Sequence, residues 1–200
     1  MYLVEFDKSY EAKGYKRIAG MDEAGRGPLA GPVVCAMVVM PLDEGSIIAG
    51  VNDSKKLSEK KREALYEEIV QKAIKYEVQI IDNSIIDTLN ILNATRLGMN
   101  TCVNNMAGQY DYLLCDYITG LEVKENFEAI VKGDATSYSI ACASIIAKVT
   151  RDRIVRKYDE LYPAFHFSKH KGYGTKEHIK ELQENGPTEV HRKTFIKHFI

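Results

Sequence analysis

Four acidic residues stand where short apolar runs end, and they are the side chains best placed for chemistry. Asp22 and Glu23 follow "YKRIAGM", Asp116 follows "YLLC", and Asp134 follows "AIVKG". A single aspartate at such a position is commonly a turn former, and Asp134 equally suits a helix N-terminus. An unpaired buried carboxylate costs several kcal/mol, so four of them at the ends of apolar runs indicate a shared cation.

The chemical type of these side chains narrows the choice of cation. All five histidines lie between His166 and His198, away from the acids in the chain. Carboxylates without histidine or thiolate ligands select hard cations such as Mg²⁺ or Mn²⁺. Two such ions ~3.5–4 Å apart can hydrolyse a phosphodiester. The acids therefore indicate phosphoryl transfer.

A glycine-rich stretch, "AGRGPLAG", follows the first two acids directly. It matches neither G-x-G-x-x-G nor the Walker pattern. Gly25, Arg26 and Gly27 would let backbone N–H and C=O groups approach a ligand closely, for example a sugar 2′-hydroxyl. A tight hairpin turn explains the same glycines equally well.

Basic and aromatic residues elsewhere suit a nucleic-acid strand. Residues 148–200 carry a net charge of +5, twelve Lys/Arg against seven Asp/Glu, within a chain of net charge −1. Tyr173, between two glycines in "KHKGYGT", could stack on a base or sugar, although tyrosines are more often buried. Lys55 and Lys56 are available to phosphates, with an ordinary solvated charge run as the alternative.

Hydrophobic periodicity predicts the elements that must position these residues. The expected strands are 15–22 and 32–40, paired as a hairpin, then 76–82, 111–117 and 126–133; the expected helices are 59–75, 83–106 with Ser84 and Asp87 near its cap, 137–161 and 175–185. A strand hairpin followed by alternating strands and helices indicates an α/β fold, a mixed sheet covered by helices.

Length and composition set the broad class of protein. Two hundred residues suit one domain, and no apolar run reaches the ~18 residues of a membrane span. The N-terminus lacks the pattern of a secretory signal, so we expect a cytoplasmic protein without membrane contact. The dispersed cysteines are expected to be buried free thiols: Cys35, Cys102, Cys115 and Cys142.

Taken together, the motifs resemble the bacterial ribonuclease HII family. The resemblance runs from about residue 17 to 196 and rests on a series of motifs in the family's order: "MDEAGRGPLAGPVV", "DSKKLS", "DTLNILNAT", "CD" at 115–116, "KGDATSYSIACASIIAKVTRDR", "HKGYGTKEH" and "GPTEVHRKTF". The joint presence of "DEAGRGP", "ASIIAKVTRDR" and "HKGYGT" makes the match specific. The related ribonuclease HIII family has an additional N-terminal domain, which this chain leaves no room for.

The resemblance implies a ribonuclease H-like catalytic domain over residues 1–160 and a C-terminal helical extension over 161–200 that contributes to substrate binding. It implies an endonuclease that cuts RNA in RNA–DNA hybrids and cuts 5′ of single ribonucleotides embedded in duplex DNA. The implied ligands of two Mg²⁺ or Mn²⁺ ions are Asp22, Glu23, Asp116 and Asp134. Gly25, Arg26 and Gly27 would contact the 2′-hydroxyl, and Tyr173 would stack on the next deoxyribose.

The resemblance also implies individual phosphate contacts and partners. Phosphate contacts are carried over to Lys55, Lys56, Ser139 and Lys148. The protein is expected to be a monomer, with a replication clamp as a candidate partner. Two rival functions stay open: a transposase- or resolvase-like nuclease that acts on DNA, and a non-catalytic module that binds hybrids.

Overall fold

The fold places a five-stranded sheet between two layers of helices. The computed structural model describes residues 2–200. In chain order the elements are α1 (Tyr2–Glu11), β1 (Ile18–Ala24), β2 (Val33–Val39), η1 (Ser54–Lys56), α2 (Glu59–Lys72), β3 (Lys75–Ile81), α3 (Asn83–Leu89), α4 (Ile91–Asn105), β4 (Tyr112–Asp116), β5 (Asn126–Ile130), η2 (Gly133–Ala135), α5 (Tyr138–Arg156), α6 (Tyr158–Leu161), α7 (Phe167–His170), α8 (Lys176–Asn185) and α9 (Lys193–Ile196).

The strand order is β3-β2-β1-β4-β5. The first three strands in the chain pair antiparallel, whereas β4 is parallel to both β1 and β5. The register sets Met21 of β1 beside Cys115 of β4. Asp22 and Asp116 each come one residue later, so the mixed sheet brings two distant acids to the same level of neighbouring strands.

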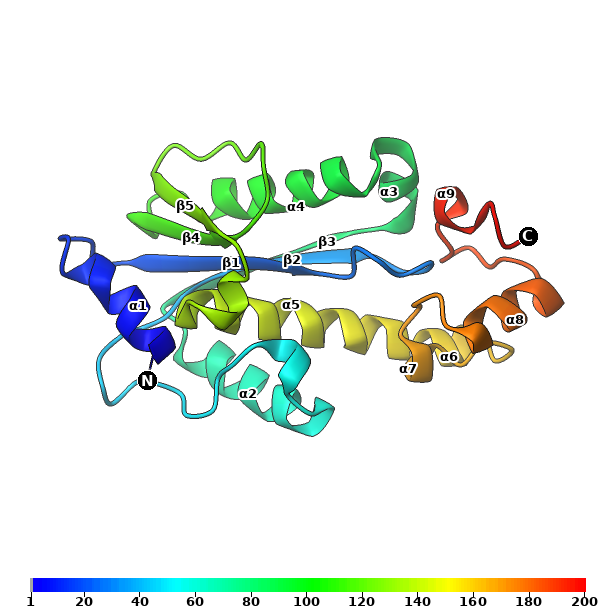
Figure 1. Ribbon diagram of the computed structural model, residues 1–200, viewed down its shortest axis with the longest axis horizontal. Helices are drawn as coiled ribbons and strands as arrows, with labels where there is room; N and C mark the ends of the chain where they lie inside the picture. The colour runs from blue at the N-terminus through cyan, green and yellow to red at the C-terminus, as the bar shows by residue number, and fades with distance from the viewer. Residues whose placement is uncertain (1) are drawn as a thin grey trace.

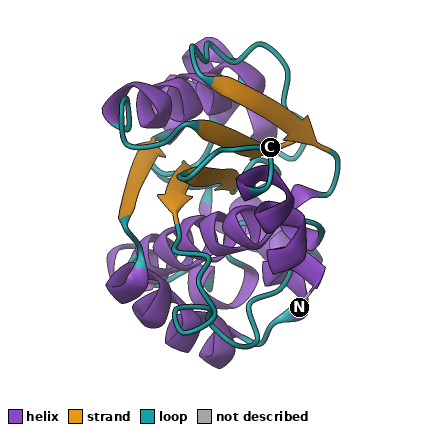
Figure 2. Ribbon diagram, turned by 90° about the vertical axis from the view of Figure 1, so that its left-hand side faces the viewer, coloured by secondary structure: helices purple, strands orange, loops and turns teal. Residues whose placement is uncertain are grey.

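Alternation along β2 divides the core into two layers. Val34, Ala36 and Val38 pack with α5 and α2 on one face of the sheet. Cys35 and Met37 pack with α4 on the other face. Figures 1 and 2 show helices on both sides of the sheet. Because both faces are covered, every residue of β2 is buried, which explains its continuous apolar run "VVCAMVV".

Helix α5 lies against β1 at unusually close range. A Cβ atom on Gly20 would be 2.0 Å from the carbonyl carbon of Ser139. Only glycine allows this approach, which brings the first turn of α5 onto the strand that carries Asp22.

The C-terminal helices lie at one end of the sheet, where they share a small hydrophobic core with the β1–β2 connection (Figure 1). Phe165, Phe167 and Leu182 are buried there together with Leu29 and Ala30 of the β1–β2 connection. The connection between β1 and β2, residues 25–32, is called the glycine loop below. It therefore packs against the C-terminal extension rather than standing free in solvent.

The expected elements agree with the structure in order and type, with the following differences. The hairpin is confirmed, but β1 runs two residues further than expected, to Ala24. The single helix expected over 83–106 is wrong: Asn90, at φ 67°, separates α3 from α4. The helix expected over 137–161 is interrupted after Arg156.

The expected cap on 83–106 is also wrong. Asp82 is the N-cap of α3 and accepts hydrogen bonds from the amides of Ser84 and Ile85. Asp87 instead accepts from the amides of Lys193 and Thr194 in the C-terminal extension.

The remaining features are the N-terminal helix, the cysteines and the apolar character of the helices. Helix α1 was not predicted. Its buried face is formed by Val4, Asp7 and Tyr10. The four cysteines are free and buried, as expected. None of the helices within residues 2–200 has the length and apolar character needed to cross a membrane.

Candidate active site

A cleft of about 230 Å³ opens where β1 and β4 end. Three of the four predicted acids and several of the predicted nucleic-acid contacts line it. The full lining is Asp22, Glu23, Ala24, Gly25, Arg26, Gly27, Ser54, Lys55, Asp116, Ser144, Lys148 and Tyr173. The fold thus gathers residues that are up to about 150 positions apart in the sequence.

The fourth acid, Asp134, lies at the border of this cleft. It is buried in the 3₁₀ turn η2, and its Oδ2 is 3.3 Å from Nζ of Lys55, which lines the cleft. Asp116 is tied to the same turn, since its Oδ1 accepts a 2.8 Å hydrogen bond from the amide of Gly133. This bond holds the third and fourth acids near each other.

The acids repel one another in a poorly solvated place. Burial raises the pKa of Asp22 well above its usual range, and the neighbouring charges of Glu23 and Asp116 raise it further. Burial also raises the pKa of Glu23, opposed by Arg26, whose Nη1 is 3.4 Å from Oε1 of Glu23. For Asp134, burial raises the pKa while Lys55 opposes the shift. A bound cation would relieve both the desolvation and the repulsion.

The glycine loop presents its backbone to this cleft. Gly25 has φ 99°, a conformation that favours glycine, and a Cβ there would lie 2.2 Å from Nε of Arg151. The carbonyl oxygens of Gly25 and Arg26 accept hydrogen bonds from the buried guanidinium of Arg192, at 2.6 and 2.9 Å. Sequence reasoning missed Arg192, because its partners lie more than 160 positions earlier in the chain.

Tyr173 lies beside the glycine loop. Its Cε1 atom is 3.8 Å from a Cβ built on Gly27, and 42% of the residue is exposed. Nζ of Lys148 is 6.0 Å from the ring centroid and also pairs with Asp152 at 2.8 Å. An exposed aromatic face between basic groups suits a nucleic-acid strand.

Two of the predicted phosphate contacts lie outside the cleft lining. Lys56 points to solvent, 4.0 Å from Asp53, with 66% of its side chain exposed. Ser139 is fully buried in the first turn of α5, where its amide donates to Asp7. In their place the cleft contains Ser54 and Ser144, whose hydroxyls are 2.9 Å apart. Both serines stood within quoted motifs, "DSKK" and "ACASIIAK", but nothing local marked them as different from their neighbours.

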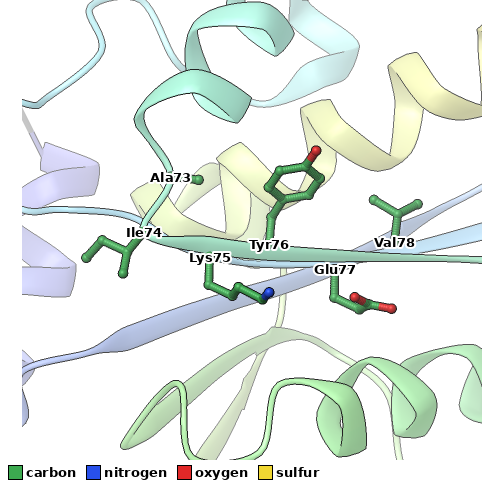
Figure 3. Close-up of a pocket in the computed structure, with 6 residues that line it drawn as sticks. All are labelled: Ala73, Ile74, Lys75, Tyr76, Glu77 and Val78. Atoms are coloured by element: carbon green, nitrogen blue, oxygen red, sulfur yellow. The ribbon is translucent and has the colours of Figure 1, made fainter.

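One other hollow and one other acidic cluster lack this convergence of acids, loop backbone and basic groups. Figure 3 shows a hollow beside the start of β3, where Ala73–Val78 contribute a single carboxylate, that of Glu77. His166, Glu177 and Glu181 have ligand atoms within 4.8 Å of one another. There Glu181 already contacts His166 and His170, and Glu177 contacts Lys169.

Comparison with known proteins agrees with this geometry. The family model described as Ribonuclease HII matches residues 19–198. Ribonuclease HII of Caldicellulosiruptor bescii is 51% identical over 196 residues, which are 98% of this chain and 94% of that protein.

Solved structures share the arrangement of the sheet and its helices. The ribonuclease H2 of Pyrococcus horikoshii has a TM-score of 0.74 at 25% identity, over 90% of this chain and 93% of that one. A chain of the PCNA:RNase HII complex from Archaeoglobus fulgidus has a TM-score of 0.72 at 27% identity, over 89% and 94%. The fold is thus the ribonuclease H fold. With its acids, glycine loop and sequence matches in agreement, this chain belongs to the ribonuclease HII family and is an endoribonuclease.

Proposed function

We propose that the protein hydrolyses the RNA strand of RNA–DNA hybrids and cuts duplex DNA on the 5′ side of a single embedded ribonucleotide, leaving 3′-hydroxyl and 5′-phosphate ends. The observation that carries this proposal is the sharing of one cleft by the acids and the backbone of the glycine loop. A group that senses a 2′-hydroxyl beside the hydrolytic site would couple recognition to cleavage.

The donor set fits divalent cations. The acids offer only oxygen ligands, and none of the described residues that line the cleft is a histidine or a cysteine. Burial and mutual repulsion disfavour the charged form of Asp22, and a cation would reverse this. We infer that Asp22, Glu23, Asp116 and Asp134 hold two Mg²⁺ or Mn²⁺ ions. Such ions, when bound, supply an activated water and neutralise charge at the departing 3′-oxygen.

Other residues of the cleft would bind and orient the substrate. The amides of Arg26 and Gly27 donate no hydrogen bond to any other group in residues 2–200, so they are available to a ribose 2′-oxygen. The exposed ring of Tyr173 would stack on the sugar of the following deoxynucleotide. Lys55 and Lys148 border the acids and would contact phosphates.

Membership of the family supports this function over the two rivals. A nuclease that acts on DNA alone has no use for a backbone that reads a 2′-hydroxyl. A module that only binds hybrids has no use for buried carboxylates that repel one another. Both rivals make distinct predictions for the substrates and variants described next.

An Asp134→Asn variant tests the assignment. Its side chain has nearly the same shape, so we expect a normal circular dichroism spectrum and loss of at least about 100-fold in cleavage of an RNA–DNA hybrid with Mg²⁺ or Mn²⁺. Asp43→Asn, which replaces an exposed acid outside the cleft, is the matched control. Near-normal cleavage by Asp134→Asn would contradict the proposal.

We also propose that a monomer of this protein is recruited by the sliding clamp of the cell. The support is the Archaeoglobus relative, which was solved with PCNA. Phe195 and Phe199 at the C-terminus pack against the core of the extension, whereas Ile200 is 61% exposed. Size-exclusion chromatography with light scattering, with and without the clamp, measures both the oligomeric state and the complex; co-elution is expected, and separate elution at micromolar concentrations would contradict recruitment.

A further inference from the structure

The guanidinium of Arg192 is a buried clamp on the glycine loop. The residue is fully buried, and all three kinds of donor on its side chain are used on carbonyl oxygens: Nη2 to Gly25 at 2.6 Å, Nη1 to Arg26 at 2.9 Å and Nε to Gly31 at 2.9 Å. Within residues 2–200 no carboxylate pairs with it. Burying an arginine that has no carboxylate partner costs free energy. We therefore look for a functional reason in the loop conformation that this arginine holds.

The direction of these carbonyls fixes the direction of the following amides. All peptide bonds in residues 2–200 are trans. In a trans peptide the N–H of one residue is antiparallel to the C=O of the residue before it. Because Arg192 holds the carbonyls of Gly25 and Arg26, the amides of Arg26 and Gly27 point away from Arg192. Both residues line the cleft, and within residues 2–200 neither amide donates a hydrogen bond to another protein group.

We propose that Arg192 is a positioning residue for ribose selectivity: its grip on the carbonyls of Gly25 and Arg26 aims the next two amides at the ribose 2′-oxygen. This inference rests on the proposed function. It assigns part of the selectivity to a residue of the C-terminal extension that touches no substrate. Lysine cannot replace it, because a single ammonium lacks the fixed fork of donors that spans three carbonyls.

Arg151 of α5 provides a matched control, because it donates to other carbonyls of the same loop. It is also fully buried and also donates only to carbonyls, those of Ala30, Pro32 and Lys171, at 3.0–3.1 Å. It therefore resembles Arg192 in burial and bonding but leaves the carbonyls of Gly25 and Arg26 untouched. Replacing it by lysine should cost stability and weaken nucleic-acid binding without changing the preference for ribose.

The experiment compares two duplexes that differ by a single 2′-hydroxyl. Dissociation constants for the ribonucleotide-containing duplex and its all-DNA twin are measured with Mg²⁺ in the Asp134→Asn background, so that neither is cut. The preference for ribose is the dissociation constant for the all-DNA duplex divided by that for the ribonucleotide-containing duplex. We expect Arg192→Lys to lower this ratio at least about tenfold, and Arg151→Lys to keep it within about threefold. An unchanged ratio in Arg192→Lys, or an equal loss in both variants, would overturn the inference.

A measurement on the chain with native Arg192 covers the case in which Arg192→Lys does not fold. In the same Asp134→Asn background, hydrogen exchange at the amides of Arg26 and Gly27 should slow on binding the ribonucleotide duplex and not on binding all-DNA. Equal protection by both duplexes would overturn the inference. A protein with native Arg192 that binds the two duplexes equally would instead contradict the proposed function, so the two failures are distinguishable.

Discussion

At the scale of single residues, Asp22 is a buried acid of the cleft with two other acids close to it. It is 4% exposed, two residues before the end of β1, and burial together with the charges of Glu23 and Asp116 raises its pKa. The sequence allowed this residue to be proposed because four acids follow short apolar runs, whereas a single acid at such a position is commonly a turn former. Ser54 and Ser144 could not be predicted in the same way, since small polar residues within helical segments have many uses.

The first prediction concerns metal binding at Asp22. A cation that binds only the folded protein stabilises it by about 2.7 kcal/mol at 100 times its dissociation constant, or roughly 5–10 °C for a chain of this size. We expect Mn²⁺ to raise the melting temperature by about that amount and EDTA to reverse the shift.

Asp22→Asn is the informative variant. It removes a ligand but also removes like-charge repulsion, so its metal-free melting temperature should equal or exceed that of the unmodified protein, while the Mn²⁺ shift falls by more than half. Asp43→Asn, outside the cleft, controls for loss of a carboxylate. The same Mn²⁺ shift in Asp22→Asn and the unmodified protein would contradict the metal assignment.

At the scale of elements, local patterns predicted more than half of the strands and helices, and the errors have identifiable causes. The break between α3 and α4 depends on Asn90 at φ 67°, a conformation that asparagine adopts without any sign in the hydrophobic pattern. Helix α1 was missed because its buried face includes a charged residue, Asp7. Only the tertiary fold shows that Asp7 accepts a hydrogen bond from the amide of Ser139, near the start of α5.

The second prediction concerns this junction of α1 and α5. Burial raises the pKa of Asp7 from its ordinary 3.8 to about 6, although hydrogen bonds from Ser137 and Ser139 oppose the shift. The folded state therefore binds more protons than the unfolded state between pH 4 and 6. The stability from the protonated form is fully present below about pH 4 and is lost as the pH rises through 6, by on the order of 3 kcal/mol.

Urea unfolding of the unmodified protein and Asp7→Asn from pH 4 to pH 7 measures this effect. Relative to Asp7→Asn, the free energy of unfolding of the unmodified protein should fall with rising pH. Glu5→Gln, on the exposed face of the same helix, is the control. A difference between the two proteins that stays constant or rises with pH would contradict the account.

At the scale of the whole molecule, the C-terminal extension and the glycine loop form one unit. Leu29 and Ala30 belong to the core of the extension, and Arg192 holds the carbonyls of Gly25 and Arg26. The sequence indicated a basic C-terminal segment but could not show this, because an arginine in "EVHRKTF" has the pattern of a solvated charge. Its buried role depends on a loop that is distant in the chain.

The third prediction concerns a line of hydrogen bonds that ends at Tyr173. The amide of Thr188 donates to Nδ1 of His191, the two Nε2 atoms of His191 and His178 are 3.0 Å apart, and Nδ1 of His178 is 2.9 Å from the carbonyl of Tyr173. An amide only donates and a carbonyl only accepts, so His191 must carry its proton on Nε2 and His178 on Nδ1.

Long-range ¹H–¹⁵N spectra at pH 7 report these tautomers directly. Both rings should be neutral, since burial lowers the pKa of His191 to about 4 and also lowers that of His178. The exposed His198 serves as an internal reference. The opposite tautomer in either ring would contradict this line of hydrogen bonds from Thr188 to the carbonyl of Tyr173.

The most direct test of the central claim is the position of a single cut. A DNA duplex with one ribonucleotide and its all-DNA twin are incubated with the protein and Mg²⁺ or Mn²⁺, and the products are mapped to the nucleotide. We predict cleavage at the phosphodiester on the 5′ side of the ribonucleotide, with 3′-hydroxyl and 5′-phosphate ends, and an intact all-DNA twin. Cleavage of both duplexes, or of neither with either metal, would contradict the account.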